Sequence, residues 1–230
     1  MFKLQKTRST PAKGKPFGRF AKGGLVVFFS LLIFTNELYC QQPQTLLYDS
    51  NGKRITDNEF VDIRMANPNY PDKTIVKRLD DGTIEFRLQK IPQEGNQAPD
   101  VRFNLLDGRT VSLADLRGKV VVLMFWYIGC PVCRAMKPQL NAFRSRFKAE
   151  DDVVFIAVTA DTKEQVKKYL AKESFDYLQA ADGQDVISNF VVGVYPKNVV
   201  ISKDGKIVYW RSVIKAWDKF EAVVREELAK

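Results

Sequence analysis

Residues 125–138 read Phe-Trp-Tyr-Ile-Gly-Cys-Pro-Val-Cys-Arg-Ala-Met-Lys-Pro, and the two cysteines stand where an apolar strand pattern gives way to a helical one. If Cys130 is the N-cap of that helix, Pro131 takes the first helical position, where its missing N–H costs nothing. The sulfur of Cys130 then faces free backbone N–H groups and the positive end of the helix dipole, which stabilise a thiolate. Cys133 follows one turn later, close enough to form a disulfide with it. The stretch therefore predicts a dithiol that exchanges disulfides.

The composition of the chain limits the other roles that this cysteine pair could have. The chain has three cysteines and no histidine. A structural zinc site needs four Cys or His ligands, and a copper site would lack an imidazole, so we expect no metal and no other cofactor. A purely structural disulfide stays open, although such bridges usually close longer loops. The position of the pair after a strand in an α/β pattern favours redox chemistry.

The basic charge of the chain is concentrated at its N-terminus. Residues 1–40 contain seven of the 36 Lys and Arg residues and one of the 27 acidic residues, within a formal net charge of +9. The remaining 29 basic and 26 acidic residues nearly balance. This distribution argues against a nucleic-acid partner.

The N-terminal 40 residues predict an export signal. The basic stretch precedes an apolar core at residues 24–34 that is short for a membrane span. Cleavage after Cys40, lipidation of Cys40 and retention as an uncleaved anchor stay open, and bulky Tyr39 fits the lipoprotein pattern poorly. We expect an exported bacterial protein of the periplasm or cell envelope, either soluble or attached to the membrane through its N-terminus. Disulfides persist outside the cytosol, so the dithiol needs a redox partner there.

The rest of the chain predicts two regions. Residues 41–95 contain short β-like pieces, at 45–48 and 83–88, separated by turn signals, and predict a small, mostly β or irregular N-terminal extension. From residue 96 to residue 230, strand and helix patterns alternate and predict an α/β sandwich with a mixed central sheet. Strands are expected at 101–105, 119–126, 153–158, 175–178, 198–202 and 206–210. Helices are expected at 131–148, 162–172 (opened by Asp161), 184–190 and 216–228, with one helical turn over 112–116.

The second region resembles the thioredoxin fold, and within it the exported disulfide reductases of the TlpA/ResA type in the redoxin (AhpC-TSA) superfamily. The resemblance covers about residues 95–230. It rests on Ala98-Pro99-Asp100 with Leu106-Asp107-Gly108-Arg109 and Asp115-Leu116-Arg117-Gly118-Lys119, on Phe125-Trp126 before the dithiol, on Pro138, and on Gly193-Val194-Tyr195-Pro196. Pro138 matches the proline that kinks the thioredoxin helix.

This resemblance implies roles for individual residues. Cys130 would be the attacking thiolate and Cys133 the resolving thiol. Pro196 would be a cis-proline beside them, with the backbone of Tyr195 binding a substrate chain. Trp126, Gly129 and Pro131 are further candidates for substrate contact, Trp126 being more typical of packing.

The sequence departs from thioredoxin at three positions near the dithiol. Gly129 replaces the tryptophan before the first cysteine, and Met124 replaces a buried carboxylate. Lys197 follows the proline where a small hydroxyl residue is common. A solvated surface lysine is the expectation there, although its charge could also act on a nearby thiol.

The function predicted from these features is thiol–disulfide exchange on exported proteins, such as apocytochrome c or other envelope proteins. The resemblance favours reduction, with a membrane electron donor that recharges the dithiol. A peroxiredoxin-type peroxidase is the first alternative, but it would need a threonine where Tyr127 stands, three residues before Cys130. A non-catalytic module that binds an envelope component is the second.

Overall fold

The computed structural model describes residues 43–66 and 74–230. The predicted export signal and Cys40 lie outside the described residues. In the part that is described, no helix combines the length and the apolar character needed to cross a membrane.

A mixed sheet of five strands carries the dithiol. Its strands are β6 (Val120–Phe125), β7 (Val153–Val158), β8 (Leu178–Ala180), β9 (Lys197–Ile201) and β10 (Ile207–Arg211). They lie in the order β10-β9-β6-β7-β8, with β6, β7 and β8 parallel and β9 antiparallel to both of its neighbours. All six residues of the central strand β6 are buried, as its continuous apolar run predicts. The predicted α/β class with a mixed central sheet is confirmed.

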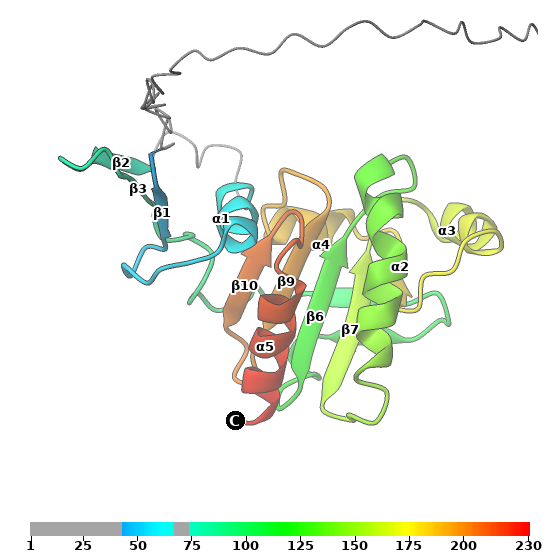
Figure 1. Cartoon of the computed structure of the whole chain (residues 1–230). Helices are drawn as coiled ribbons and strands as arrows, with labels where there is room; N and C mark the ends of the chain where they lie inside the picture. The colour runs from blue at the N-terminus through cyan, green and yellow to red at the C-terminus, as the bar shows by residue number, and fades with distance from the viewer. Residues whose placement is uncertain (1–42, 67–73) are drawn as a thin grey trace, which may run out of the picture. The chain divides into compact units, whose positions relative to one another are not determined.

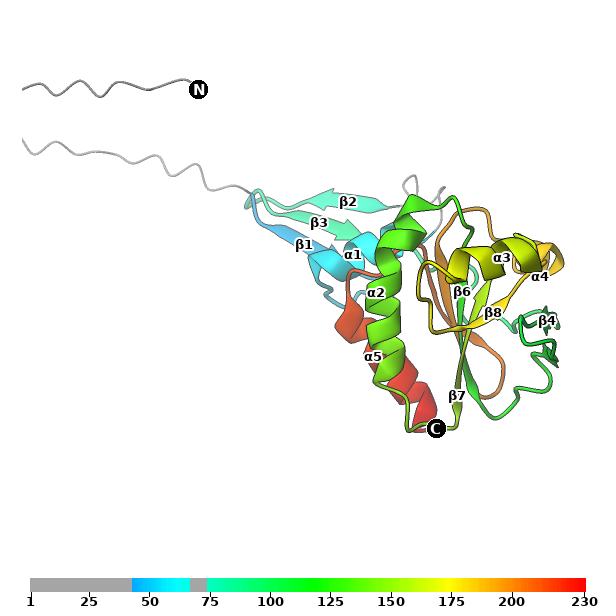
Figure 2. The ribbon, with the colours of Figure 1, turned by 90° about the vertical axis from the view of Figure 1, so that its right-hand side faces the viewer.

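Helices cover both faces of this sheet (Figures 1 and 2). They are α2 (Pro131–Ser145), α3 (Lys163–Leu170), α4 (Gln184–Asn189) and α5 (Trp217–Leu228). The side chains of β6 alternate between two cores. Met124 and its same-face neighbours pack with α2 and α5 in the cluster that contains both cysteines. Phe125 packs on the opposite face with α4 and the hairpin of β4 (Arg102–Asn104) and β5 (Thr110–Ser112).

The N-terminal segment is more than the β or irregular piece expected. It has a three-stranded sheet in the order β1-β3-β2, built from β1 (Thr45–Tyr48), β2 (Ile75–Arg78) and β3 (Ile84–Arg87). It also has a helix, α1 (Asp57–Arg64), which the prediction missed. A capping box fixes its start, because the Thr56 hydroxyl accepts the Glu59 N–H while the Glu59 carboxylate accepts the Thr56 N–H.

Three local predictions need correction. The strand expected at 175–178 begins at Leu178, because β8 pairs with β7 only from that residue onward. The helix expected to open at Asp161 is capped instead by Thr162, which forms a capping box with Gln165. The segment expected as a helical turn from Ser112 begins as the last residue of β5 and continues in turns, although Ser112 does cap the Asp115 N–H.

Candidate active site

The two cysteines lie at the junction of β6 and α2. Cys130 is the N-cap of α2, with extended backbone angles (φ −82°, ψ 106°), and Pro131 is the first residue of the helix, as predicted. Cys133 lies in the first turn and forms a disulfide with Cys130, with their Cα atoms 5.2 Å apart. The junction therefore holds the two sulfurs at bonding distance.

The N-terminus of α2 supplies the stabilisation expected for a thiolate. The backbone N–H of Cys133 donates a hydrogen bond to the Cys130 Sγ at 3.0 Å. The first turn of this helix carries no acidic residue that would repel a negative sulfur. A thiolate formed at Cys130 on reduction would thus gain from both the N–H and the helix dipole.

Both cysteines are shielded from solvent in the disulfide form. Cys130 is 3% exposed and Cys133 is 1% exposed. Both lie in the apolar cluster under α2, which also contains Met124, itself fully buried. The side chain that stands where thioredoxin has a carboxylate is therefore an apolar neighbour in the same core and offers the dithiol no proton acceptor.

The loop before β9 reaches the end of β6 from which the dithiol loop leaves. The Tyr195–Pro196 peptide bond is cis, as predicted. Lys197, the next residue, pairs with Phe125, the last residue of β6. The Tyr127 and Tyr195 rings contact each other edge to face, with centroids 5.4 Å apart. The fold thus brings the proline loop and the dithiol loop together.

The exposed rim around the dithiol differs in part from the prediction. Gly129 and Pro131 are exposed, and so are Tyr127 (42%) and Val132 (46%). Trp126 is only 1% exposed, because its ring packs against Tyr169 and Phe175 with centroids 5.4 and 5.8 Å away. The expected contact of Trp126 with substrate is therefore corrected: this ring is part of the core.

Asp161 supports the dithiol loop and was missed as a site residue. Its carboxylate accepts the backbone N–H of Ile128 at 2.8 Å and the Thr159 hydroxyl at 2.7 Å. It thereby ties the residues just before Cys130 to the end of β7. The contact joins positions 33 residues apart, so no local pattern could have revealed it.

The surroundings of Lys197 also differ from those predicted from the sequence. Lys197 is not a solvated surface lysine but is 2% exposed. Its Nζ donates to the carbonyl oxygen of Ala66 and, at 2.8 Å, to the Ser212 hydroxyl. Burial, and then the charge of Arg211, lower the pKa of Lys197 to about 8.

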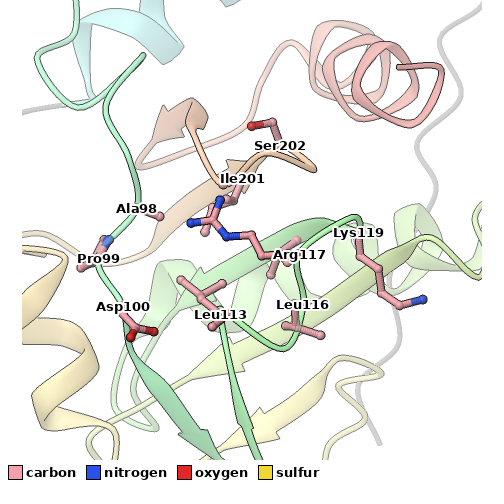
Figure 3. A pocket seen from close by; sticks show the side chains of 12 residues that line it. Ala98, Pro99, Asp100, Leu113, Leu116, Arg117, Lys119, Ile201 and Ser202 are labelled. Atoms are coloured by element: carbon pink, nitrogen blue, oxygen red, sulfur yellow. The ribbon is translucent and has the colours of Figure 1, made fainter.

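The groove shown in close-up lies away from the dithiol (Figure 3). It has a volume of about 230 Å³ and is lined by Lys119 and Val121 at the start of β6, by Ile201 at the end of β9 and by Arg117, but by no cysteine. The dithiol follows the other end of β6. The reactive pair therefore lies outside this groove.

Comparison with known proteins agrees with this geometry. The sequence model of the Redoxin family matches residues 93–223, which include both cysteines and Pro196. The chain belongs to the Redoxin family. The matched region leaves out β1, α1, β2 and β3.

Curated and solved proteins that are similar to this chain are named for thiol–disulfide exchange. The thiol-disulfide oxidoreductase ResA of Bacillus thuringiensis (strain Al Hakam) is 36% identical over 118 residues, which are 50% of this chain and 68% of that protein. The thioredoxin domain of a thiol-disulfide oxidoreductase from Bacteroides vulgatus superposes with a TM-score of 0.51 at 28% identity, over 58% of this chain and 96% of that one. A thiol:disulfide interchange protein from a Bacteroides species gives 0.51 at 27% identity, over 60% and 91%. The fold is thioredoxin-like, and the chain is a thiol–disulfide oxidoreductase.

Proposed function

We propose that this redoxin reduces disulfides of exported proteins, with Cys130 as the attacking residue. The observation that carries the assignment of Cys130 is the hydrogen bond from the Cys133 N–H to the Cys130 Sγ, at 3.0 Å, at the start of α2. The same bond and the helix dipole would favour the thiolate once the disulfide is reduced. Of the two sulfurs, that of Cys130 is the one held at the N-cap. Because a stabilised thiolate makes a dithiol more oxidising, the reductive direction rests instead on the resemblance to the TlpA/ResA-type reductases.

The reaction would proceed in two exchanges. The Cys130 thiolate attacks one sulfur of the substrate disulfide, and the other substrate sulfur leaves as a thiolate that takes up a proton. Cys133 then loses its proton and attacks the Cys130 sulfur, which re-forms the Cys130–Cys133 disulfide and releases the second substrate thiol. Two electrons pass to the substrate, so an external dithiol must reduce the pair before the next cycle.

The loops beside the dithiol would bind the substrate chain. An extended segment could hydrogen-bond to the backbone at Tyr195 beside cis-Pro196, in the manner of an added strand. Gly129 and Pro131, with exposed Tyr127 and Val132, offer it a small and largely apolar rim. A side chain at position 129 would crowd the exposed Tyr127 ring, because a Cβ there would lie 3.3 Å from it.

The proposed location and partners are supported by the N-terminal pattern and by the family resemblance. The basic stretch and apolar core before residue 40 support export to the periplasm or cell envelope. Lipidation of Cys40 or an uncleaved anchor would hold the protein at the membrane. A membrane-bound dithiol donor would recharge it there. Apocytochrome c is one candidate substrate, and other exported proteins with disulfides are also candidates. Residues 41–95 would be an N-terminal extension that packs on the catalytic domain at 96–230.

Trapping a substrate tests the assignment of the two cysteines. In a Cys133→Ser variant the mixed disulfide on Cys130 cannot be resolved, so we expect adducts that a reductant releases. The matched Cys130→Ser variant should trap none. Adducts formed through Cys133 alone would reverse the roles, and rapid consumption of hydrogen peroxide by the reduced protein would favour the peroxidase alternative.

The direction of electron flow is tested by the reduction potential of the Cys130–Cys133 pair. We expect a value nearer that of thioredoxin, about −270 mV, than that of the oxidant DsbA, about −120 mV. Equilibration with a glutathione or dithiothreitol redox buffer, followed by thiol alkylation, measures it. A value close to that of DsbA would contradict the reductive direction and leave disulfide exchange intact.

A further inference from the structure

A buried ammonium links the start of β9 to the N-terminal segment. Lys197 directly follows cis-Pro196, and its Nζ hydrogen-bonds to the carbonyl oxygen of Ala66 and to the Ser212 hydroxyl. The ammonium also lies over the Trp210 ring, 5.1 Å from its centroid. Lys197, Ala66 and Ser212 are 2%, 0% and 4% exposed. The three groups therefore form a fixed contact inside the protein.

The side chain of Lys197 lies on the face of the sheet opposite the dithiol. Lys197 pairs with Phe125, and directly paired residues of neighbouring strands share a face. Phe125 packs in the cluster under α4, whereas both cysteines pack in the cluster under α2. Lys197 is therefore placed to act on the dithiol side only through its backbone and that of Pro196.

Helix α1 is held against the segment before α5 by a second buried charge. The carboxylate of Asp62, 2% exposed, accepts the N–H of Lys215 at 2.8 and 2.9 Å and the N–H of Ala216 at 2.8 Å, just before α5. Ala66 follows the end of the same helix. The carbonyl that receives the Lys197 ammonium is thus part of a segment docked on the catalytic domain, and none of this segment lies in the region matched by the Redoxin family.

A lysine at this buried position is energetically unfavourable because its ammonium loses its hydration. Burying an ammonium destabilises the native state unless hydrogen bonds compensate, and a well-packed apolar residue is often as stable or more so. What the ammonium adds is direction, because its donors point to two fixed oxygens. At the residue after the cis-proline, that direction fixes the backbone against which a substrate chain would lie.

We propose that Lys197 is a positioning residue for protein substrates: by fixing the start of β9 to Ala66, it sets the Tyr195–Pro196 peptide for binding an extended polypeptide beside Cys130. The proposal rests on the proposed function and deepens it, because it makes the N-terminal segment part of substrate selection. A small disulfide needs only access to Cys130 and should not depend on this contact.

The test compares two disulfides in full-length Lys197→Met, which replaces the ammonium by an apolar side chain of similar length. With insulin as the protein disulfide, we expect KM to rise at least fivefold with kcat within twofold of the wild type. With the small aromatic disulfide 5,5′-dithiobis(2-nitrobenzoate), the rate constant should stay within twofold. Lys197→Arg, which keeps the charge and the donors, should recover part of the insulin KM.

Lys203→Met is the matched control. Its Nζ also donates to a carbonyl oxygen, that of Leu228 at 2.7 Å, but near the turn between β9 and β10. We expect its insulin KM to stay that of the wild type. If Lys197→Met fails to fold, Ser212→Ala keeps the ammonium, removes one acceptor and should raise the insulin KM in the same direction.

The outcomes separate this proposal from the proposed function. A wild-type protein that reduces neither disulfide contradicts the function itself. A wild-type protein that reduces both, with an insulin KM unchanged in Lys197→Met, overturns only the role of Lys197. An equal loss on both disulfides would also overturn it, because it would indicate general damage to the dithiol.

Discussion

At the scale of single residues, Asp161 decides how firmly the chain before Cys130 is held. In Asp161→Ala the Ile128 N–H loses its acceptor, and an unpaired, partly buried donor costs about 1–3 kcal/mol. We therefore expect the free energy of unfolding in urea to fall by about that amount, and the rate of insulin reduction to fall several-fold as the loop loosens.

A second aspartate provides the control for that prediction. Asp107 pairs with Arg109 at 2.7 Å on the surface, where both side chains are about half exposed. Removing an exposed ion pair changes stability little, so Asp107→Ala should behave like the wild type. Equal effects in the two variants would show that the Ile128 contact does not matter for the loop.

Residues with a local signature could be predicted from the sequence, and residues defined by distant contacts could not. The positions of Cys130, Pro131 and Cys133 follow from helix-capping rules that involve only neighbours. The burial of Lys197 could not be predicted in this way, because it depends on Ala66, 131 positions away. The sequence allows Trp126 either role, and its contacts with Tyr169 and Phe175 place it in the core.

At the scale of elements, most strands and helices follow from apolar periodicity, and the misses have identifiable causes. The sequence of α1 contains the Thr56–Glu59 capping box. Its apolar residues, however, show only a weak helical periodicity, so the segment could not be distinguished from its β-like neighbours. The shift of β8 arises because Phe175 and Tyr177 alternate like strand residues while they pack in the aromatic cluster ahead of the paired strand.

The start of α4 provides a prediction at this scale. A Cβ on Gly183, its N-cap, would lie 2.8 Å from the Val158 Cγ1 and 3.1 Å from the Thr159 carbonyl oxygen. Gly183→Ala should therefore push α4 from the end of β7 and lower the free energy of unfolding by about 1–3 kcal/mol. Thermal unfolding followed by circular dichroism measures the loss.

Gly193→Ala is the matched control for Gly183→Ala. Gly193 lies in the loop before Tyr195, and a Cβ there would have no atom within 4 Å. Because alanine restricts the unfolded chain, Gly193→Ala should be neutral or slightly stabilising. A destabilisation as large as that of Gly183→Ala would mean that lost glycine freedom, rather than the clash, is responsible.

At the scale of the whole molecule, the question is whether the N-terminal segment and the catalytic domain unfold together. The Asp62 carboxylate binds the N–H groups of Lys215 and Ala216 across this junction. Asp62→Ala leaves both without that acceptor, at a cost of about 2–4 kcal/mol in total. We expect a lower Tm and earlier proteolysis of the segment around α1.

Asp57 in the same helix is the matched control, since its side chain is exposed in the first turn of α1. Asp57→Ala removes only a favourable interaction with the helix dipole, worth a few tenths of a kcal/mol to about 1 kcal/mol. Proteolysis rates that match between Asp57→Ala and Asp62→Ala would argue that the junction does not hold the segment.

The pH dependence of stability reports on the buried charge at that junction. Burial lowers the pKa of Lys197 from 10.5 to about 8, so between these values the unfolded chain binds more protons than the native one. The free energy of unfolding must then rise with pH across this window, by up to about 3 kcal/mol. Below pH 8 both states are protonated at Lys197, and the native state carries the full cost of the buried charge.

Urea unfolding of wild type and Lys197→Met at pH 7, 9 and 10.5 isolates this contribution, because the other titrating groups are common to both proteins. The stability of the wild type relative to the variant should increase with pH, since only the wild type loses a buried charge. A neutral amine still donates hydrogen bonds to Ala66 and Ser212. The change in the insulin KM of the wild type between pH 7 and 10.5 should therefore be much smaller than the change that the Lys197→Met substitution causes. If the free energy of unfolding of the wild type relative to Lys197→Met stays flat or falls with pH, the ammonium is better solvated than its burial indicates. An insulin KM that follows the titration of Lys197 would assign the positioning effect to the charge rather than to the hydrogen bonds.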